Sequence, residues 1–443
     1  MADSIFHKDF KAMPWWWEAW HPGSERSQDP PSRTDVLVIG AGYGGLSTAL
    51  EYARSGGEVT VLERGDFGVG ASTRNGGAVS GGTSLGKGFS GKKAMAEDQK
   101  KALMAAMLHD AGESLAQVER VIQREGIECS WRSAGRFLGA YTSRHYDDLA
   151  RSLGTYNGAA GAGARMLPRE RQREEIDSEY YHGGMVVERA GQLHPALYFA
   201  GLLEAAERAG ARLCANTDAT RIERRPHGGF IAHTSKGTIE AREVVIATNG
   251  YTGDLTPRLK RRLVPVASHI IATEELPEDL ARSLIPKGRT ISDTKRVLCY
   301  YRLSPDSRRV IFGGRARFTQ VSPVVSAPVL HRYMTERWPQ LAGCKVTHAW
   351  TGNVAFAFDY LPHMGKDDGM HYLLCCNGSG VAMMSYLGYQ TARKLLGGSD
   401  EANNAFDGRD FPSAPLYNGA PWFLPMVGAW YRTRDWWDRK DQT

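Results

Sequence analysis

Residues Asp35–Glu63 read DVLVIGAGYGGLSTALEYARSGGEVTVLE, and this stretch decides the fold class. An apolar run, Val36–Ile39, leads into a glycine-rich turn. A helix of small residues follows, and then a second apolar run that ends on Glu63. The pattern predicts two parallel strands joined by a helix, as in a Rossmann-like nucleotide-binding unit.

The three glycines of the turn have separate tasks in such a unit. Gly40 permits the tight turn, Gly42 lets the backbone approach a pyrophosphate, and Gly45 lets the helix pack close to the first strand. The N-terminus of the helix offers unpaired N–H groups and a partial positive charge to the diphosphate. Glu63 is placed to accept hydrogen bonds from the adenosine ribose. We therefore predict a bound dinucleotide.

The bulk composition limits the classes of protein that remain. A chain of 443 residues predicts at least two packed units. The net charge of +6 is scattered along the chain, so we expect no nucleic-acid partner. The six cysteines have no CxxC spacing, which argues against a disulfide scaffold or a zinc site. The first residues lack a secretory pattern, and the cytoplasm is the expected compartment.

Tryptophans crowd both ends of the chain. A membrane surface is one interpretation of them, and packing against the body of the protein is the one that we favour. The tryptophans concerned are Trp15, Trp16, Trp17 and Trp20 near the N-terminus and Trp422, Trp430, Trp436 and Trp437 near the C-terminus.

Further glycine-rich turns follow predicted strands. The loop GVGASTRNGGAVSGG occupies residues 68–82, and the strand 244–247 opens into Thr248, Asn249 and Gly250. Near the C-terminus a strand, 372–376, meets the turn NGSG and a helix. Ligands of such sheets bind at strand ends of this kind. Between them, residues 263–341 alternate like an antiparallel sheet that covers the ligand.

Taken in order, the motifs VIGAGYGG, ASTRNGG, GQLHP, VIATNGYTG, DYLPHMG and NGSGVAMMSYLG resemble the FAD-dependent amine and D-amino-acid oxidase superfamily. Within it, RNGG, ATNGYT and YYRLSPDSRRVIFGG are most similar to the γ-glutamylputrescine oxidase-like branch. The resemblance implies an α/β and α+β architecture, in which a discontinuous Rossmann-like FAD-binding domain is joined to an antiparallel-sheet substrate domain. The implied division is an aromatic arm (1–33), an FAD-binding domain (34–93, 180–262 and 342–398), a substrate domain (94–179 and 263–341) and a C-terminal extension (399–443).

The resemblance also implies the cofactor contacts. The loop after the second strand would run beside the flavin, and the last glycine turn would place a helix N-terminus at the pyrimidine side of the ring. The implied FAD-binding residues are Gly40, Gly42, Tyr43, Gly44, Gly45, Glu63, Arg64, Ser72, Thr73, Arg74, Asn75, Gly76, Gly77, Thr248, Asn249, Gly250, Gly378, Ser379, Gly380 and Val381.

Three departures from the family pattern bear on the chemistry. Relatives that oxidise glycine or D-amino acids carry an arginine after a W-x-G, which clamps the substrate carboxylate, whereas Val354 stands at its apparent place. A simple α-amino acid is therefore disfavoured unless Arg302 or Arg315 substitutes. Relatives that attach FAD covalently use a cysteine in this region, and none lies between Trp350 and Asp359, so we expect non-covalent FAD. The strand 310–314 also lacks the lysine that promotes reaction with oxygen in some relatives.

Three residues are candidates for the substrate site. His269 lies on a strand that we expect to face the flavin, with a buried core histidine as the alternative. Tyr300 and Arg302 share one face of another strand and are predicted to line the substrate pocket, with ordinary sheet packing as the alternative.

The expected activity is removal of a hydride from the carbon next to an amine nitrogen, which gives an imine that hydrolyses. The expected substrate is a γ-glutamylputrescine-like or other N-substituted amine, and the electron acceptor is O2 or another oxidant. An oxidase is favoured over a dehydrogenase. The alternatives are a D-amino-acid or N-methyl-amino-acid oxidase or dehydrogenase, and a non-catalytic FAD-binding subunit of an assembly. No metal is expected.

Overall fold

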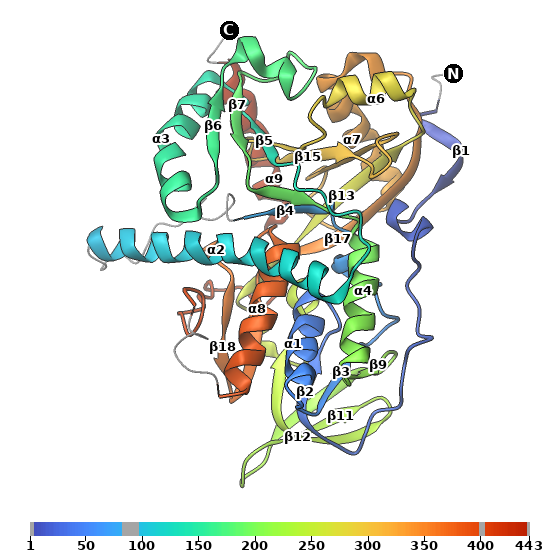
Figure 1. Ribbon diagram of the computed structural model, residues 1–443, viewed down its shortest axis with the longest axis vertical. Coiled ribbons are helices and arrows are strands. Elements are labelled where there is room, and N and C mark those ends of the chain that lie inside the picture. The colour runs from blue at the N-terminus through green and yellow to red at the C-terminus, as the bar shows by residue number, and fades with distance from the viewer. Residues whose placement is uncertain (1–3, 82–96, 398–403, 441–443) are drawn as a thin grey trace.

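The computed structural model describes residues 4–81, 97–397 and 404–440. Two sheets dominate it, and Figure 1 shows the larger sheet in the upper half of the molecule and the smaller sheet in the lower half. The glycine-rich motifs belong to the smaller sheet.

The smaller sheet is the predicted Rossmann-like unit. Its order is β10 (Ala219–Arg224), β11 (Phe230–Thr234), β12 (Gly237–Ile246), β2 (Arg33–Ile39), β3 (Val59–Leu62) and β9 (Arg212–Cys214), with β19 (Met370–Leu374) beside β12 and β18 (His363–Asp367) beside β19. Strands β9, β3, β2, β12 and β19 are parallel to their neighbours in this series. Val36, Leu37 and Val38 of β2 are all buried, as expected of a strand covered on both faces.

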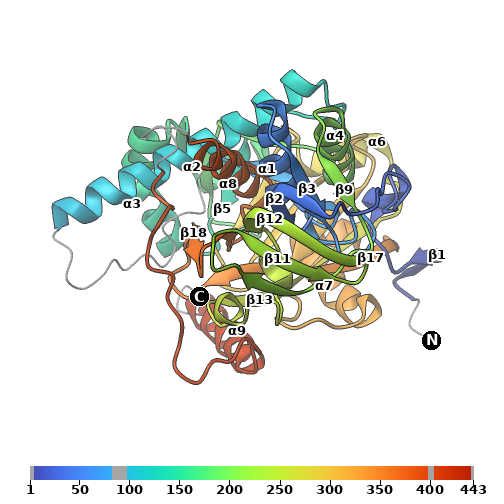
Figure 2. The same ribbon diagram turned by 90° about the horizontal axis from the view of Figure 1, so that it is seen from below.

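Three helices cover one side of the smaller sheet, as Figure 2 shows: α1 (Tyr43–Arg54), α4 (Pro195–Arg208) and α8 (Gly380–Leu395). Small residues let α1 and α8 approach closely, because a Cβ on Gly388 would lie 2.3 Å from the carbonyl oxygen of Gly44. This contact fixes the two helix N-termini relative to each other.

The larger sheet is mostly antiparallel. Its order is β1 (Phe6–Lys11), β17 (Val346–Ala357), β13 (Leu263–Thr273), β16 (Val310–Gly314), β15 (Cys299–Leu303), β14 (Thr290–Asp293), β5 (Arg136–Gly139), β7 (Gly184–Val187) and β6 (Ala164–Leu167). The pairs β1–β17 and β14–β5 are parallel. Helices α6 (Glu278–Leu284) and α7 (Pro323–Arg337) lie in the same half of the molecule (Figure 1). Within residues 263–341 the predicted alternation corresponds to β13, β14, β15 and β16, whereas residues 278–284 and 323–337 form α6 and α7 instead of strands.

The remaining helices, short strands and turns flank the two sheets. They are α2 (Glu97–Glu125), α3 (Ser143–Ala160), α5 (Pro257–Lys260), the short strand pair β4 (Ala78–Ser80) and β8 (Ala190–Gln192), and 3-10 turns that include η1 (Trp15–Glu18), η2 (Ala71–Thr73) and η4 (Asn249–Tyr251).

Three elements depart from the predicted domain boundaries. Strands β7 and β17 fall within segments predicted for the FAD-binding domain, but both pair in the larger sheet. β17 belongs to the larger sheet because it pairs with β13 along its whole length, from Val346 to Ala357. Helix α2 falls within a segment predicted for the substrate domain, and it packs against α8 and α4 beside the smaller sheet.

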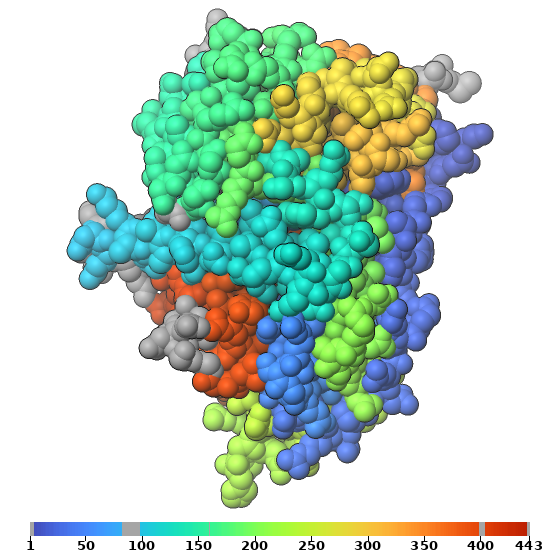
Figure 3. Space-filling model, viewed as in Figure 1, coloured from blue at the N-terminus to red at the C-terminus, as the bar shows by residue number. Residues whose placement is uncertain are grey.

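The N-terminal arm packs on the body, as we expected. In Figure 3 it follows one edge of the molecule from the upper half to the lower half. Trp16 is fully buried, and Trp20 packs against Phe199 of α4, with their ring centroids 5.4 Å apart.

The C-terminal helix α9 (Leu424–Lys440) also packs on the body, but not through its tryptophans. Leu424, Gly428 and Asp435 are its buried residues. The terminal helix thus packs across the domain as expected, while Trp422, just before it, and Trp430, Trp436 and Trp437 on it are 48–64% exposed.

None of the helices in residues 4–81, 97–397 and 404–440 is both long and apolar enough to cross a bilayer. The same ranges hold no group of three or more His, Cys, Asp or Glu side chains arranged to bind a metal ion.

Candidate active site

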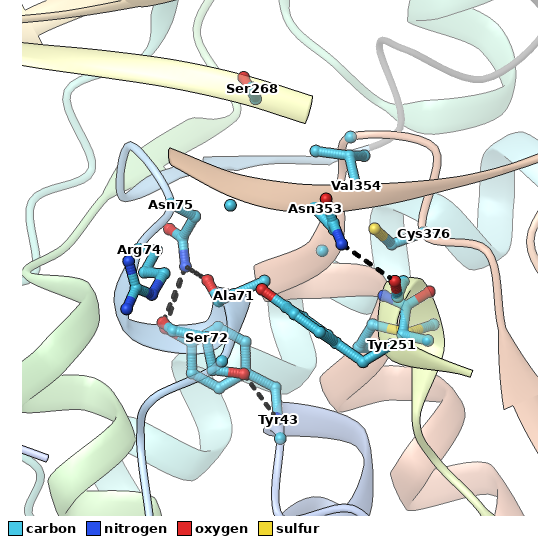
Figure 4. A pocket seen from close by; sticks show the side chains of 18 of the residues that line it. Tyr43, Ala71, Ser72, Arg74, Asn75, Tyr251, Ser268, Asn353, Val354 and Cys376 are labelled. Carbon is cyan, nitrogen blue, oxygen red and sulfur yellow. Dashed lines mark hydrogen bonds between the residues drawn. The ribbon is translucent and has the colours of Figure 1, made fainter. Parts of the chain in front are cut away.

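One cavity of about 1080 Å³ lies between the two sheets. Its lower wall consists of the loops that follow β2, β3, β12 and β19, and its upper wall consists of residues from β5, β13, β14, β15 and β17, together with Arg315 just after β16. Figure 4 shows this arrangement, with Tyr43 and Ser72 on one side and Ser268 and Val354 on the strands opposite. The volume slightly exceeds that of a typical small-molecule pocket, as a site for both a dinucleotide and a substrate requires.

The glycine turn has the geometry that a pyrophosphate site needs. Gly40 has a φ of +104°, a conformation that glycine adopts without strain. A Cβ on Gly45 would lie 1.9 Å from the carbonyl oxygen of Gly40, so only glycine allows α1 to start this close to β2. Gly42 is the N-cap of α1 and has no capping side chain of its own. The turn and the helix N-terminus therefore fit a diphosphate.

Glu63 directly follows β3, and it lines the cavity. One carboxylate oxygen accepts a hydrogen bond from the backbone N–H of Ala41 (3.2 Å) and the other from that of Gly65 (3.3 Å). Burial raises the pKa of this carboxyl group, and the two N–H groups oppose the rise. These bonds hold Glu63 against the glycine turn, where the ribose of a dinucleotide would lie.

The loop of residues 71–77 forms one side of the cavity and is held by its own asparagine. The Asn75 side chain donates to the carbonyl oxygens of Ser72 (2.8 Å) and Ala71 (3.3 Å) and accepts from the N–H of Gly77 (2.9 Å). Figure 4 shows the first two bonds folding the loop back on itself. The hydroxyl of Ser72 accepts from the N–H of Tyr43, which ties the loop to the start of α1.

Tryptophans hold the same loop from behind. Trp16 of the N-terminal arm donates its indole N–H to Asn75 O (2.9 Å), and Trp17 donates to the Thr73 hydroxyl (2.9 Å). Trp350 of β17 donates to Arg74 O (2.7 Å). The Arg74 guanidinium also lies 4.6 Å from the ring of Trp17. Sequence reasoning placed the arm on the body but missed this contact, because no motif links residues so far apart.

The ends of β12 and β19 complete the lower wall. The Asn249 side chain accepts from the N–H of Cys375 (3.0 Å) and thereby joins the two strand ends. Helix α8 begins beside them at Gly380, and its N-cap, Ser379, makes no side-chain capping bond. The N-terminus of α8 thus offers free N–H groups at the cavity.

Most of the predicted cofactor residues line this cavity. They are Gly40, Gly42, Tyr43, Gly44, Glu63, Arg64, Ser72, Arg74, Asn75, Gly76, Thr248, Asn249, Gly250, Gly378, Gly380 and Val381. The remaining four do not line it and are Gly45, Thr73, Gly77 and Ser379. Of these, Gly45 and Thr73 hold the turn and the loop in shape, as described above.

Tyr300 is the one predicted catalytic candidate that lines the cavity. Its hydroxyl lies 2.9 Å from the hydroxyl of Ser268 on β13, and burial raises its pKa to about 12. The ring lies over Gly313 of β16, where a Cβ would meet it at 2.3 Å. Phe356, Tyr360 and Tyr431 extend this aromatic wall, and Tyr431 comes from α9.

His269 does not reach the cavity. Its neighbours Ser268 and Ile270 line the cavity, so the alternation of β13 turns His269 to the other face of the sheet, where it is fully buried. The prediction that it faces the flavin is therefore contradicted by the register.

Arg302 is also outside the cavity, although it shares a strand face with Tyr300. Its guanidinium is buried and donates to the carbonyl oxygens of Leu193 (2.8 Å), Gly77 (3.3 Å) and Leu303 (2.9 Å). These bonds support the 71–77 loop from the side away from the ligand. The alternative that we gave, structural packing, describes Arg302 better.

Sequence reasoning missed several polar residues of the upper wall. No motif marks them, and strand alternation alone does not tell which face meets the cavity. They are Arg136, Ser268, Ser292, Thr294, Lys295, Arg296 and Asn353.

Known proteins resemble this chain over most of its length. Residues 35–394 match the family model described as "DAO: FAD dependent oxidoreductase". The γ-glutamylputrescine oxidoreductase of Escherichia coli K12 is 32% identical over 90% of this chain and 92% of its own. A protein named probable oxidoreductase OrdL from Rhizobium meliloti is 31% identical over 95% and 97%. The crystal structure of glycine oxidase from Geobacillus kaustophilus superposes with a TM-score of 0.68 at 22% identity and covers 87% of this chain and 99% of its own.

Proposed function

We propose, since the chain belongs to the DAO family of FAD-dependent oxidoreductases, that it oxidises an amine at the carbon next to nitrogen. The cofactor is FAD, and no cysteine lies between Trp350 and Asp359 to bind it covalently. When bound, FAD supplies the acceptor for a hydride. The products are an imine and, after hydrolysis, an aldehyde and an amine or ammonia.

The observation that carries this proposal is the continuity of the cavity. It reaches from Glu63 at the end of β3 to Tyr300 on β15 without interruption. One end has the turn, the helix N-terminus and the carboxylate that fit a dinucleotide. The other end is walled by aromatic rings, so a substrate there is desolvated next to the cofactor.

The protein contributes position and environment rather than an acid–base pair. Glu63, Asp218 and Asp254 are the acidic residues among those described that line the cavity, and all three belong to the smaller-sheet half. The Tyr300 hydroxyl, with its pKa near 12, stays protonated at neutral pH and orients a ligand through its hydrogen bond with Ser268. Hydride removal needs a neutral, correctly placed amine, and a dry aromatic wall favours that form.

The substrate that we propose is a γ-glutamylputrescine-like or other N-substituted amine. Val354 lines the cavity, and by its place after Trp350-Thr351-Gly352 in the sequence we expect it to correspond to the arginine of relatives that oxidise simple amino acids. The 32% identity with the γ-glutamylputrescine oxidoreductase supports the same class. A D-amino acid or an N-methyl amino acid is the in-class alternative, and it is supported by the similarity to glycine oxidase, which is 26% identical over 348 residues.

The test is an anaerobic reduction screen of the purified flavoprotein. We expect γ-glutamylputrescine to bleach the flavin absorbance faster than putrescine, D-alanine or sarcosine does. Bleaching by dithionite but by no amine would contradict the proposal and leave a non-catalytic FAD-binding subunit. Faster bleaching by D-alanine or sarcosine would favour the in-class alternative.

The electron acceptor is tested separately. We propose an oxidase, so readmission of air after reduction should release hydrogen peroxide and restore the flavin absorbance within the turnover time. Slow reoxidation in air, with rapid reoxidation by an artificial quinone, would identify a dehydrogenase. Acid precipitation should release all the FAD into the supernatant, because we expect no covalent bond.

A further inference from the structure

The outward face of α9 gathers the exposed tryptophans of the protein. Trp422, just before the helix, and Trp430, Trp436 and Trp437 on it are 48–64% exposed, and Met426 between them is 59% exposed. All remaining tryptophans of the sequence are buried or half-buried. Large apolar side chains seldom gather on a surface that stays in water, so this concentration in one short segment indicates a contact surface.

The inward face of α9 packs on the body and fixes the direction in which these tryptophans point. The ring centroid of Tyr431 lies 5.9 Å from that of Phe318, and Tyr431 lines the main cavity. Met426, Trp430 and Trp437 follow one another at spacings of four and seven residues, so the helix places them together on the side away from the body.

The acidic side chains of α9 turn toward the body. The helix contains two acids, Asp435 and Asp438, and both pair with Arg296. Asp435 also accepts hydrogen bonds from the backbone N–H groups of Arg296 (3.0 Å) and Val297 (2.9 Å) and is 4% exposed. Within Leu424–Lys440, all of which the structure describes, the outward face therefore carries no carboxylate.

The basic side chains of α9 lie beside the exposed tryptophans instead. Arg432 and Lys440 are exposed. The Arg434 guanidinium lies 5.6 Å from the ring centroid of Trp430, and the Lys440 ammonium lies 5.1 Å from that of Trp436. The outward face thus combines apolar rings with positive charge. It is complementary to a partner that offers both an apolar layer and negative charge.

We propose that the outward face of α9 binds the surface of an anionic lipid bilayer. Tryptophan prefers the boundary between headgroups and acyl chains, and arginine and lysine are attracted to anionic headgroups. The helix lies in the plane of the surface in this arrangement, because no described helix is long and apolar enough to cross a bilayer. Figure 2 shows α9 at the edge of the molecule, where a flat surface can reach it. A second copy of this chain is less suitable, since two such faces would bring like charges together.

The test is co-sedimentation of the purified, FAD-loaded protein with lipid vesicles. One set of vesicles is phosphatidylcholine alone, and the other contains phosphatidylglycerol and phosphatidylcholine in a ratio of about 3 to 7. One variant carries Trp430→Gln and Trp437→Gln and loses two exposed rings. Another carries Arg432→Gln and Arg434→Gln and loses two positive charges.

Matched controls make the same kinds of change elsewhere on the surface. Val324→Gln with Val325→Gln removes two apolar side chains that are 49% and 51% exposed on α7. Arg221→Gln with Arg282→Gln removes two positive charges whose side chains are 70% and 69% exposed. All four variants should keep the wild-type FAD content and Tm, because the changed side chains lie at the surface.

We expect the wild-type protein to bind the phosphatidylglycerol vesicles at least about tenfold more tightly than the phosphatidylcholine vesicles. The tryptophan variant should bind them about tenfold more weakly or less, since two rings no longer enter the interface. The arginine variant should bind about fivefold to thirtyfold more weakly, and raising the NaCl concentration should weaken wild-type binding in the same way. Both controls should match the wild type.

The proposal would be overturned if the wild-type protein bound neither kind of vesicle or bound both equally. Wild-type affinity of the tryptophan variant would also overturn it. Dimerisation of the wild type in analytical ultracentrifugation, lost in the tryptophan variant, would identify a second copy as the occupant instead. The comparison of the two lipids needs no variant, so a variant that fails to fold leaves the decision intact. None of these measurements involves turnover, so the result is independent of the proposed amine oxidation.

Discussion

Substitution of Gly45 by alanine tests the close contact between α1 and the glycine turn. Two effects of the added methyl group oppose each other. Alanine is favoured over glycine within a helix by about 1 kcal/mol. The new Cβ, however, would lie 1.9 Å from the carbonyl oxygen of Gly40, whereas ordinary contact begins at 3.4 Å, so the two must separate by about 1.5 Å.

The neighbour at Gly45 is backbone, which no rotamer change can move. Overpacking of this kind costs about 1–3 kcal/mol or more, and the helix preference of alanine offsets part of this cost. We therefore expect Gly45→Ala to destabilise the native arrangement of the glycine turn by about 2 kcal/mol. If the glycine turn of the variant rearranges in the FAD-free protein and FAD binding restores its native shape, the cost of about 2 kcal/mol weakens FAD binding by about 30-fold. If the turn stays in place in both states, it appears as a lower Tm of the apoprotein.

The measurement combines FAD titration of the apoprotein, followed by quenching of flavin fluorescence, with thermal unfolding of the same sample. The matched control is Gly154→Ala, because Gly154 lies in α3 with nothing within 4 Å of an added Cβ. The control should bind FAD normally and be slightly more stable. A Gly45→Ala protein with both the wild-type FAD affinity and the wild-type apoprotein Tm would refute the argument.

Three further predictions follow from the site. Glu63→Gln should weaken FAD binding by about tenfold in the same titration, since a neutral amide accepts the ribose hydrogen bonds less well; unchanged affinity would contradict the ribose assignment. Trp16→Phe removes the hydrogen-bond donor to Asn75 O and should raise the FAD dissociation constant by about tenfold. Trp437→Phe changes an exposed tryptophan and should leave the constant unchanged. Equal FAD affinity of the two variants would exclude a role for the N-terminal arm in FAD binding. Burial, together with a smaller effect of the nearby Arg302 charge, lowers the pKa of His194 to about 4. Between about pH 6.5 and pH 4 the unfolded chain therefore binds a proton at this histidine that the native state does not bind. The contribution of His194 to the free energy of unfolding should therefore be complete above about pH 6.5 and fall by about 3 kcal/mol toward pH 4. His194→Asn keeps an acceptor at the N-cap of α4 and should make Tm depend less on pH in this range. An unchanged dependence of Tm on pH would show that His194 is not the titrating group.

The nucleotide half of the site was predictable because its signals are local. Gly40, Gly42 and Gly45 lie within six residues of one another, and the geometry of a single turn requires glycine at each of these positions. The strand ends at Glu63 and Asn249 could be predicted for a similar reason, since an apolar run that stops on a polar residue marks the edge of a parallel sheet.

The substrate half could not be predicted in the same way. Whether Ser268 or His269 meets the cavity depends on which face of β13 is turned inward, and a shift of one residue exchanges the two. Tyr300 and Arg302 do share a face, but the cavity ends between them. The sequence also gives no sign of which face of α9 meets the body, because the contacts with Arg296 that turn both acids of the helix inward form only in the three-dimensional arrangement.

The order of strands in the smaller sheet has a consequence for synthesis of the protein. Strand β2 pairs with β12, and β12 pairs with β19, while Thr48 of α1 donates to the carbonyl oxygen of Gly388 on α8. These contacts join residues separated by up to 340 positions. The first glycine turn leaves the ribosome long before its partners exist, so the nascent chain has no complete place for FAD until α8 has emerged. Loading with FAD is therefore a late event, and a ribosome that stalls before residue 380 leaves a chain with exposed apolar strands rather than a smaller flavoprotein.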